Sequence, residues 1–325
     1  MNVAIIGTGL IGKKRAQSLP GHVNLKTVCD IDLVKGNEFA YLFNCIFEKS
    51  WQKVVKDKRI QAIFISVTNN NLSRIANSAI SSGKHVLIEK PGGINIKQLR
   101  ETYTIYKRNP IVVMYGYNHR YHPAIQKAKQ LIDSQRFGNI LFIRARYGHG
   151  GRLGYEKEWR FQKEVSGGGE LIDQGCHLID LVNFFCGEMD QATGFITNLF
   201  WKTKLEDAAF FQLRNKKNQV ADLSVTCVEW KNIFSFEIML QNAKIQIDGL
   251  GGSYGKEKLI LYKMRPEMGP PDKEEFEFTD EDTSWKDENN LFFNKIKQKD
   301  YNNTSIKEAM YVLGIIEKLY QKNIV

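Results

Sequence analysis

The most informative residues for chemistry stand near the start of the chain, in the sequence Gly7-Thr8-Gly9-Leu10-Ile11-Gly12. They follow an apolar run at residues 3–6, typical of a buried strand, and precede a helix-like stretch. In a G-x-G-x-x-G turn the first glycine permits a tight bend, the second lets a pyrophosphate approach the backbone, and the third lets the helix pack on the strand. The phosphates then lie among the amide donors at the positive end of the helix. We therefore expect a dinucleotide to bind at Gly7, Gly9, Leu10, Ile11 and Gly12.

Asp30 stands at the end of the second expected strand, 18 residues after Gly12. A carboxylate there accepts hydrogen bonds from a ribose 2′-hydroxyl and repels a 2′-phosphate, which favours NAD over NADP. Lys13, Lys14 and Arg15 lie close in sequence and carry the charge that a 2′-phosphate needs. We expect NAD as the cofactor and keep NADP as the alternative. If the chain binds no cofactor, the same residues form only a tight turn and an aspartate on the surface.

The elements that must position this turn alternate along the first part of the chain. Strands are expected at residues 3–6, 25–29, 62–67, 85–88 and 111–115, and helices at 11–19, 34–42, 72–81 and 96–106. Strands that are apolar throughout are buried on both faces, as in a parallel sheet covered by helices. The pattern predicts a doubly wound parallel Rossmann sheet, and we place this NAD(P)-binding domain at residues 1–118.

The pattern changes after about residue 117. Helices are expected at residues 123–134, 170–185 and 305–321, and strands at 140–147, 195–201, 208–213, 221–227 and 234–240. The polar turn at residues 215–218 joins two of these strands, as in an antiparallel hairpin. Residues 266–288 are expected to form a loop with one short strand. We predict an α+β domain with a mostly antiparallel sheet over residues 119–325, which binds substrate and mediates oligomerisation.

Composition and charge restrict the class of protein. The chain has 325 residues and a net charge of +10, but its basic residues are scattered and form no stripe interleaved with aromatic residues. No apolar run approaches the roughly 20 residues that cross a bilayer, and no basic leader precedes the first apolar run. The five cysteines are dispersed, as in a reduced cytoplasmic protein. We expect a cytoplasmic protein with no nucleic-acid or membrane partner, and no metal because ligand-type spacings are missing.

Three further motifs follow the glycine turn in a fixed order. They are Glu89-Lys90-Pro91, then Gly-Tyr-Asn-His-Arg-Tyr-His-Pro at residues 116–123, then a glycine-rich segment at 167–180 that contains Asp173 and His177. With these motifs the chain resembles the glucose–fructose oxidoreductase and inositol dehydrogenase family, Gfo/Idh/MocA, over nearly its whole length. It departs from the family pattern at Thr68 and Leu72, where the family commonly has proline and histidine.

The resemblance implies a Rossmann domain followed by a domain with a large, mostly antiparallel sheet, whose outer face commonly forms dimers or tetramers. It implies reversible hydride transfer between a nicotinamide cofactor and a carbinol carbon of a sugar, cyclitol or nucleotide sugar. By position, Lys90 matches the motif lysine of the family, and Asp173 and His177 match its D-x-x-x-H pair. A homodimer or homotetramer that acts on a small sugar-type molecule is therefore expected.

The chemistry of these three residues agrees with that activity. Asp173 and His177 are four positions apart, so on a helix they project from one face. An imidazole suits removal of a hydroxyl proton near neutral pH, and Asp173 would hold a substrate hydroxyl. Lys90, at the carboxyl end of a strand, would donate a hydrogen bond to the reacting oxygen and lower the pKa of the alcohol. The alternative for Asp173 and His177 is a solvated contact between two side chains, and the alternative for Lys90 is an exposed strand end.

Further residues complete the expected site. Cofactor contacts are expected at Ser66, Asn69, Glu89 and Lys90, and substrate contacts at Asn118, Arg120, Tyr121, Trp159 and Arg160. Arg160 can bind a carboxylate or phosphate as a two-pronged donor, with Trp159 packing on a ring. The alternatives are an interdomain hydrogen-bond network for the first three substrate candidates and a surface loop for the last two.

Two functions of different class remain open at this point. The sequence favours an NAD-dependent dehydrogenase of sugar-type substrates, because a pure nucleotide binder has no need of Lys90, Asp173 and His177 together. The alternative is a non-catalytic regulatory or sensor protein on the same fold.

Overall fold

The computed structural model describes residues 1–267, 269–278 and 281–323. The chain divides into two compact units. Unit 1 comprises residues 1–117, 164–167 and 285–313, and unit 2 comprises residues 118–163, 168–284 and the chain from residue 314 onward.

In the described part of unit 1, six parallel strands form one sheet in the order β3-β2-β1-β4-β5-β6. The strands are β1 (Asn2–Ile6), β2 (Asn24–Cys29), β3 (Ile46–Glu48), β4 (Ala62–Ile65), β5 (His85–Glu89) and β6 (Val113–Gly116). The helices are α1 (Leu10–Gln17), α2 (Leu33–Leu42), α3 (Trp51–Lys56), α4 (Asn69–Ser81), α5 (Ile96–Tyr106), α9 (Ser284–Gln298), and the first part of α10 (Thr304–Lys322). The parallel Rossmann sheet is confirmed. The three-residue β3 was not predicted, because it is too short to show a period.

The core of unit 1 includes a helix from near the end of the chain. Phe64 on β4 is fully buried, and its ring lies 5.5 Å from that of Phe292 and 5.9 Å from that of Phe293, both on α9. The expected loop at 266–288 does contain one strand, but the helix already begins at Ser284, so the loop prediction is wrong over its last residues. Residues 268 and 279–280 of that stretch lie outside the described residues.

Unit 2 contains the second sheet. Its described residues form eight strands in the order β14-β13-β12-β11-β7-β10-β9-β8. The strands are β7 (Ile140–Gly148), β8 (Gln191–Thr197), β9 (Ala208–Arg214), β10 (Val220–Thr226), β11 (Ile233–Leu240), β12 (Ala243–Asp248), β13 (Lys258–Lys263) and β14 (Asp272–Glu277). β7 and β10 pair in parallel, and the other pairs described in this sheet are antiparallel, so the mostly antiparallel sheet is confirmed.

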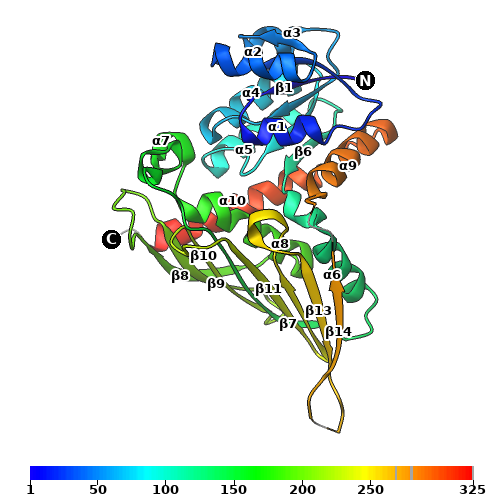
Figure 1. Ribbon diagram of the computed structural model, residues 1–325, viewed down its shortest axis with the longest axis vertical. Coiled ribbons are helices and arrows are strands. Elements are labelled where there is room, and N and C mark those ends of the chain that lie inside the picture. Colours follow the sequence, from blue (N-terminus) through cyan, green and yellow to red (C-terminus); the bar gives the residue numbers. More distant parts are fainter. Residues whose placement is uncertain (268, 279–280, 324–325) are drawn as a thin grey trace. The chain divides into compact units, whose positions relative to one another are not determined.

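Alternation of side chains along these strands gives the sheet two different faces. On β7, Ile143, Ala145 and Tyr147 are buried, whereas Arg144 and Arg146 are exposed. The helical elements of this unit are η1 (Asn118–Tyr121), α6 (Pro123–Asp133), η2 (Tyr155–Lys157), η3 (Trp159–Phe161), η4 (Leu171–Gly175), α8 (Cys176–Cys186) and η5 (Gly252–Tyr254). The short α7 (Lys163–Ser166) is divided between the units, with Lys163 assigned to unit 2 and residues 164–166 to unit 1. Helices α6 and α8 lie on the same side of the sheet (Figure 1).

Two local hydrogen-bond patterns explain where strands end. The β9–β10 hairpin turns at residues 215–218 as expected, because Asn215 Oδ1 accepts from the backbone N–H groups of Lys217 and Gln219, both at 3.0 Å. The strand expected at 195–201 lies earlier, at Gln191–Thr197. The strand ends there because the buried carboxylate of Asp207 accepts hydrogen bonds from the backbone N–H groups of residues 199, 200 and 201.

Candidate active site

The glycine turn at the end of β1 has the geometry that its spacing predicts. Gly7 has φ +100°, and a Cβ added there would lie 2.2 Å from Ser66 O, while one on Gly12 would lie 2.0 Å from Gly7 O. A Cβ on Gly9 would have no heavy atom of the described residues within 4 Å, its chain neighbours aside. The first and third glycines therefore serve packing, whereas the second leaves an open approach to the first turn of α1. Gly9 also supplies no capping side chain to that turn, so the turn suits a pyrophosphate.

Asp30 lies directly beside this turn. Its Oδ2 accepts hydrogen bonds from the backbone N–H and the hydroxyl of Thr8, both at 2.8 Å, and its Oδ1 accepts from Asp32 N at 2.9 Å. A carboxylate has about four acceptor positions, so these bonds fix Asp30 and leave capacity for ribose hydroxyls. The side chains of Leu10 and Ile31 next to it are 73% and 87% exposed and offer apolar surface to a base. These residues fit a bound NAD.

Arg15 does not supply charge for a 2′-phosphate. Its guanidinium is completely buried, with Nε 2.7 Å from Glu89 Oε1 and a terminal nitrogen 2.6 Å from Glu288 Oε2. Burial opposes the charged form, but Glu89 and Glu288 outweigh it and raise the pKa of Arg15 above its ordinary value. Arg15 therefore pairs with carboxylates inside unit 1, and its charge does not support binding of NADP.

The other cofactor candidates lie at the carboxyl ends of neighbouring strands. Ser66 follows β4, and its backbone packs against Gly7, while Lys90 follows β5 and is half-buried. β4 and β5 are paired, so both residues lie at the same sheet edge. Asn69 begins α4, and its Nδ2 donates to Ser166 O at 2.8 Å. Glu89 is bonded to Arg15, a contact that the sequence did not indicate.

Asp173 and His177 lie at the start of the long helix of unit 2. Asp173 belongs to a π-helical turn, η4, and His177 to α8, which follows without a break; π-turns recur at functional sites. The helix expected at 170–185 is confirmed, with a wider first turn. The two residues are 9% and 4% exposed. Arg160 Nε donates to Asp173 Oδ2 at 3.0 Å, and the Arg160 guanidinium lies 4.8 Å from the Trp159 ring. The structure therefore brings Asp173, Arg160 and Trp159 together.

His177 has a neighbour that the sequence did not reveal. Its ring stacks on that of His119, with centroids 3.8 Å apart and planes 25° apart. The ring of Tyr147 makes T-shaped contacts with both, and its centroid lies 5.1 Å from that of His119 and 6.1 Å from that of His177. Burial raises the pKa of Tyr147 well above its ordinary value, so its phenol stays protonated. His119 falls within the motif at residues 116–123, but no spacing in the sequence pairs it with His177.

The remaining substrate candidates lie on η1. Asn118 Nδ2 donates to Ser284 Oγ at 2.9 Å, and Arg120 makes a two-pronged pair with Asp180, at 2.7 and 2.6 Å. Tyr121 is half-buried in the same turn. Asn118 and Arg120 thus make internal contacts of unit 2 in this structure.

Two searches of the described residues bear on metals and membranes. No cluster of three or more His, Cys, Asp or Glu residues is arranged to hold a metal ion in the described ranges. No helix in the described part of the chain has the length and apolar character needed to cross a membrane.

Comparison with known proteins places this geometry in a family. Residues 1–117 match the model of an oxidoreductase family with an NAD-binding Rossmann fold, and residues 125–246 match that of the GFO/IDH/MocA C-terminal domain. Levoglucosan dehydrogenase of Pseudarthrobacter phenanthrenivorans is 30% identical over 203 residues, covering 58% of this chain and 52% of that protein. Trans-1,2-dihydrobenzene-1,2-diol dehydrogenase of Xenopus laevis is 29% identical over 170 residues, covering 51% and 50%. The chain's matches thus span about half the length of these relatives.

Solved structures show the same fold over the whole chain. Levoglucosan dehydrogenase in complex with NADH and L-sorbose superimposes with a TM-score of 0.89, at 20% identity, over 99% of this chain and 97% of that one. The chain therefore belongs to the Gfo/Idh/MocA family of oxidoreductases, and its first 117 residues are the NAD-binding Rossmann domain of that family.

Proposed function

We propose that this protein is an NAD-dependent dehydrogenase that oxidises a carbinol carbon of a sugar-type substrate and catalyses the reverse reduction. The observation that carries the proposal is the environment of His177, which is buried, ring-stacked and one helical turn after the Arg160-bound Asp173. Such a site can hold a base in a fixed orientation. The names of two relatives, which specify levoglucosan and a cyclic diol, support a hydroxyl-bearing ring as substrate.

Each residue has one role in the proposed reaction. When bound, nicotinamide supplies the hydride acceptor. Lys90 donates a hydrogen bond to the reacting oxygen, and His177 accepts the hydroxyl proton and returns it in the reverse direction. Asp173 accepts a hydrogen bond from a neighbouring substrate hydroxyl, and Arg160 holds its carboxylate in place at 3.0 Å. Asp30 selects NAD by accepting from the ribose.

The domain boundary and cellular location complete the proposal. The NAD(P)-binding domain is taken as residues 1–118 and the substrate domain as 119–325. All five cysteines are free thiols, which supports a reducing, cytoplasmic location. A non-catalytic nucleotide sensor on the same fold is the alternative, and the presence of Lys90 with Asp173 and His177 favours the enzyme.

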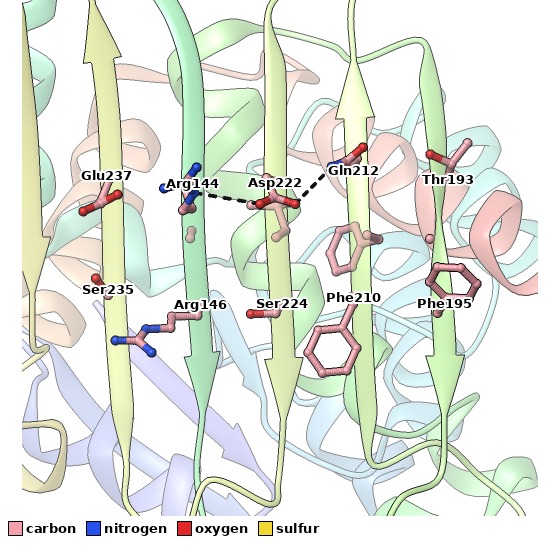
Figure 2. A pocket seen from close by; sticks show the side chains of 14 residues that line it. Arg144, Arg146, Thr193, Phe195, Phe210, Gln212, Asp222, Ser224, Ser235 and Glu237 are labelled. Carbon is pink, nitrogen blue, oxygen red and sulfur yellow. Dashed lines mark hydrogen bonds and ion pairs between the residues drawn. The ribbon is translucent and has the colours of Figure 1, made fainter.

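We also infer that copies of the chain associate through the outer face of the unit 2 sheet. Figure 2 shows this face, where side chains of five neighbouring strands line a hollow of about 870 Å³. Phe195 and Phe210 are 78% and 45% exposed on it, and the side chains of Arg144 and Asp222 pair nearby at 3.9 Å. Exposed apolar side chains beside paired charges are typical of interfaces. Light scattering should show a smaller assembly for a Phe195→Glu, Phe210→Glu double variant and no change for Tyr41→Glu, a control at an exposed site of unit 1.

The dehydrogenase proposal is tested by absorbance at 340 nm. The protein is incubated with NAD or NADP and a panel of levoglucosan, L-sorbose, inositol, glucose and UDP-glucose. We expect NADH formation with at least one member of the panel. A protein that binds NAD tightly in calorimetry, yet forms neither NADH nor NADPH with any carbohydrate of the panel, would support the sensor instead.

A further inference from the structure

His119 lies against the proposed acid–base residue on a separate element of unit 2. It belongs to η1, whereas His177 lies on α8, 58 residues later. The two imidazole centroids are 3.8 Å apart and their planes differ by 25°, which is a stacked arrangement. The side chains are 6% and 4% exposed, so water is largely excluded from both rings. One face of the His177 ring is therefore covered by His119.

The turn that carries His119 is attached to α8 at a second point. Arg120 donates through two nitrogens to both carboxylate oxygens of Asp180, at 2.7 and 2.6 Å. Asp180 is three residues after His177 on the same helix, and its side chain is fully buried. A two-pronged guanidinium–carboxylate pair fixes orientation as well as distance. The pair therefore clamps η1 onto the helix segment that bears His177.

The His119 ring is also held from its other sides. Its Nδ1 lies 3.2 Å from Asn118 Oδ1, and the amide nitrogen of Asn118 donates to Ser284 Oγ. The rings of Tyr147 and Phe234 meet it in T-shaped contacts, with centroids 5.1 and 6.1 Å from its own and planes at 62° and 63°. Close packing on this scale leaves a side chain one low-energy orientation.

We propose that His119 is a positioning residue, which fixes the ring plane of His177 so that its nitrogen faces the hydroxyl proton. The inference rests on the proposed function and deepens it. Proton transfer requires heavy atoms within about 2.6–3.2 Å, and a misplacement of about 1 Å costs up to about 100-fold in rate. A planar ring stacked on His177 restricts rotation about its side-chain bonds, and Arg120 with Asp180 holds that ring in place.

Two variants separate stacking from other roles of His119. His119→Ala removes the ring, whereas His119→Phe keeps a planar ring of similar size. We expect His119→Ala to lower kcat by about 10- to 100-fold while the KM for NAD changes less than about 2-fold. His119→Phe should recover kcat to within about 3-fold of the unaltered protein. An unchanged kcat in His119→Ala, or a folded His119→Phe that is as slow as His119→Ala, would overturn the proposal.

A measurement without substrate tests the same point. In ¹⁵N-histidine NMR of the full chain, signals of His177 are assigned by their loss in His177→Ala. We expect sharp single signals in the unaltered protein and in His119→Phe, and broadened or doubled signals in His119→Ala. Sharp, single signals in a folded His119→Ala would contradict the positioning role. If the proposed function is wrong, His177→Ala has full activity or the protein oxidises no substrate. Neither result affects the NMR comparison, which needs no substrate.

Discussion

The guanidinium of Arg15 lies 2.7 Å from the carboxylate of Glu89 in the interior of unit 1. It also contacts Glu288 at 2.6 Å and Asn289 at 3.0 Å, both on α9, and the ring of Trp285 lies 4.7 Å from its central carbon. Arg15, on the cofactor helix α1, is thereby joined to the strand that ends just before Lys90 and to Asn289 on α9, 274 residues later in the chain. The three elements depend on one another through this buried charge.

Replacing Arg15 should destabilise the protein strongly. In Arg15→Met the carboxylates of Glu89 and Glu288 lose their shared cation inside the protein, and breaking a buried pair typically costs about 3–5 kcal/mol. Urea unfolding followed by circular dichroism measures the change. Arg108→Met, at an exposed position, is the control and should change the free energy of unfolding by less than about 0.5 kcal/mol. A loss below about 1 kcal/mol in Arg15→Met would show that the network contributes little.

Two glycines of the cofactor turn should respond differently to alanine. A Cβ on Gly12 would meet the backbone oxygen of Gly7 at 2.0 Å, so Gly12→Ala should cost about 1–3 kcal/mol or more of stability. Gly9 has a negative φ and open space at its Cβ position, so Gly9→Ala should retain stability within about 0.5 kcal/mol.

The Gly9→Ala methyl group would instead stand where a pyrophosphate approaches. We expect its affinity for NAD in calorimetry to fall by about 10-fold or more, with the melting temperature little changed. Equal NAD affinity in Gly9→Ala and the unaltered protein would mean that the phosphates bind elsewhere.

Cofactor choice should depend on Asp30. Asp30→Ala removes the acceptor for ribose hydroxyls and the charge that repels a 2′-phosphate, so NAD should weaken more than NADP. The ratio of kcat/KM for the two cofactors measures this, and Asp287→Ala, at an exposed position of α9, controls for loss of charge. An equal fall in kcat/KM for NAD and NADP would show that Asp30 does not determine cofactor specificity.

Stability should fall in mild acid because of His85. Its Nδ1 accepts from Val112 N at 2.9 Å, so the folded protein holds the neutral ring, and burial lowers the pKa of His85 below its ordinary value of 6.5. Protonation favours the unfolded chain, so this contribution is complete above pH 6.5 and is lost as the pH falls below it.

The matched variant is His85→Asn, whose amide oxygen can still accept from Val112 but does not titrate. The melting temperature of the unaltered protein should fall more than that of His85→Asn between about pH 7.5 and pH 5.5. Parallel losses in the two proteins would assign the acid sensitivity to other groups.

Much of the fold could be predicted because its signals are local. Continuous apolar runs marked β1 and β4, whose residues are nearly all fully buried, and the glycine spacing located the cofactor turn beside Asp30. Helix α9 was missed because Glu288 and Asn289 occupy buried positions in its apolar stripe. Those polar residues are there to bind Arg15, a contact that only the folded chain reveals.

Only those parts of the candidate site that depend on residues close in sequence could be predicted. Asp173 and His177 are four residues apart, so their proximity followed from helix geometry. The stacking of His119 on His177 and the pairing of Arg120 with Asp180 join elements about 60 residues apart, and no periodicity encodes them. The strand expected at 195–201 was misplaced because the carboxylate of Asp207 binds that backbone instead.

We propose that His177 and Lys90 carry out NAD-linked oxidation of a carbohydrate hydroxyl, and the rate of NADH formation by their alanine variants tests this most directly. With a substrate found in the panel, His177→Ala and Lys90→Ala should each lower kcat by about 10²- to 10⁴-fold. His22→Ala and Lys97→Ala, at exposed positions, should retain the rate of the unaltered protein. Folded His177→Ala and Lys90→Ala proteins that form NADH at the unaltered rate would show that neither residue takes part in the reaction.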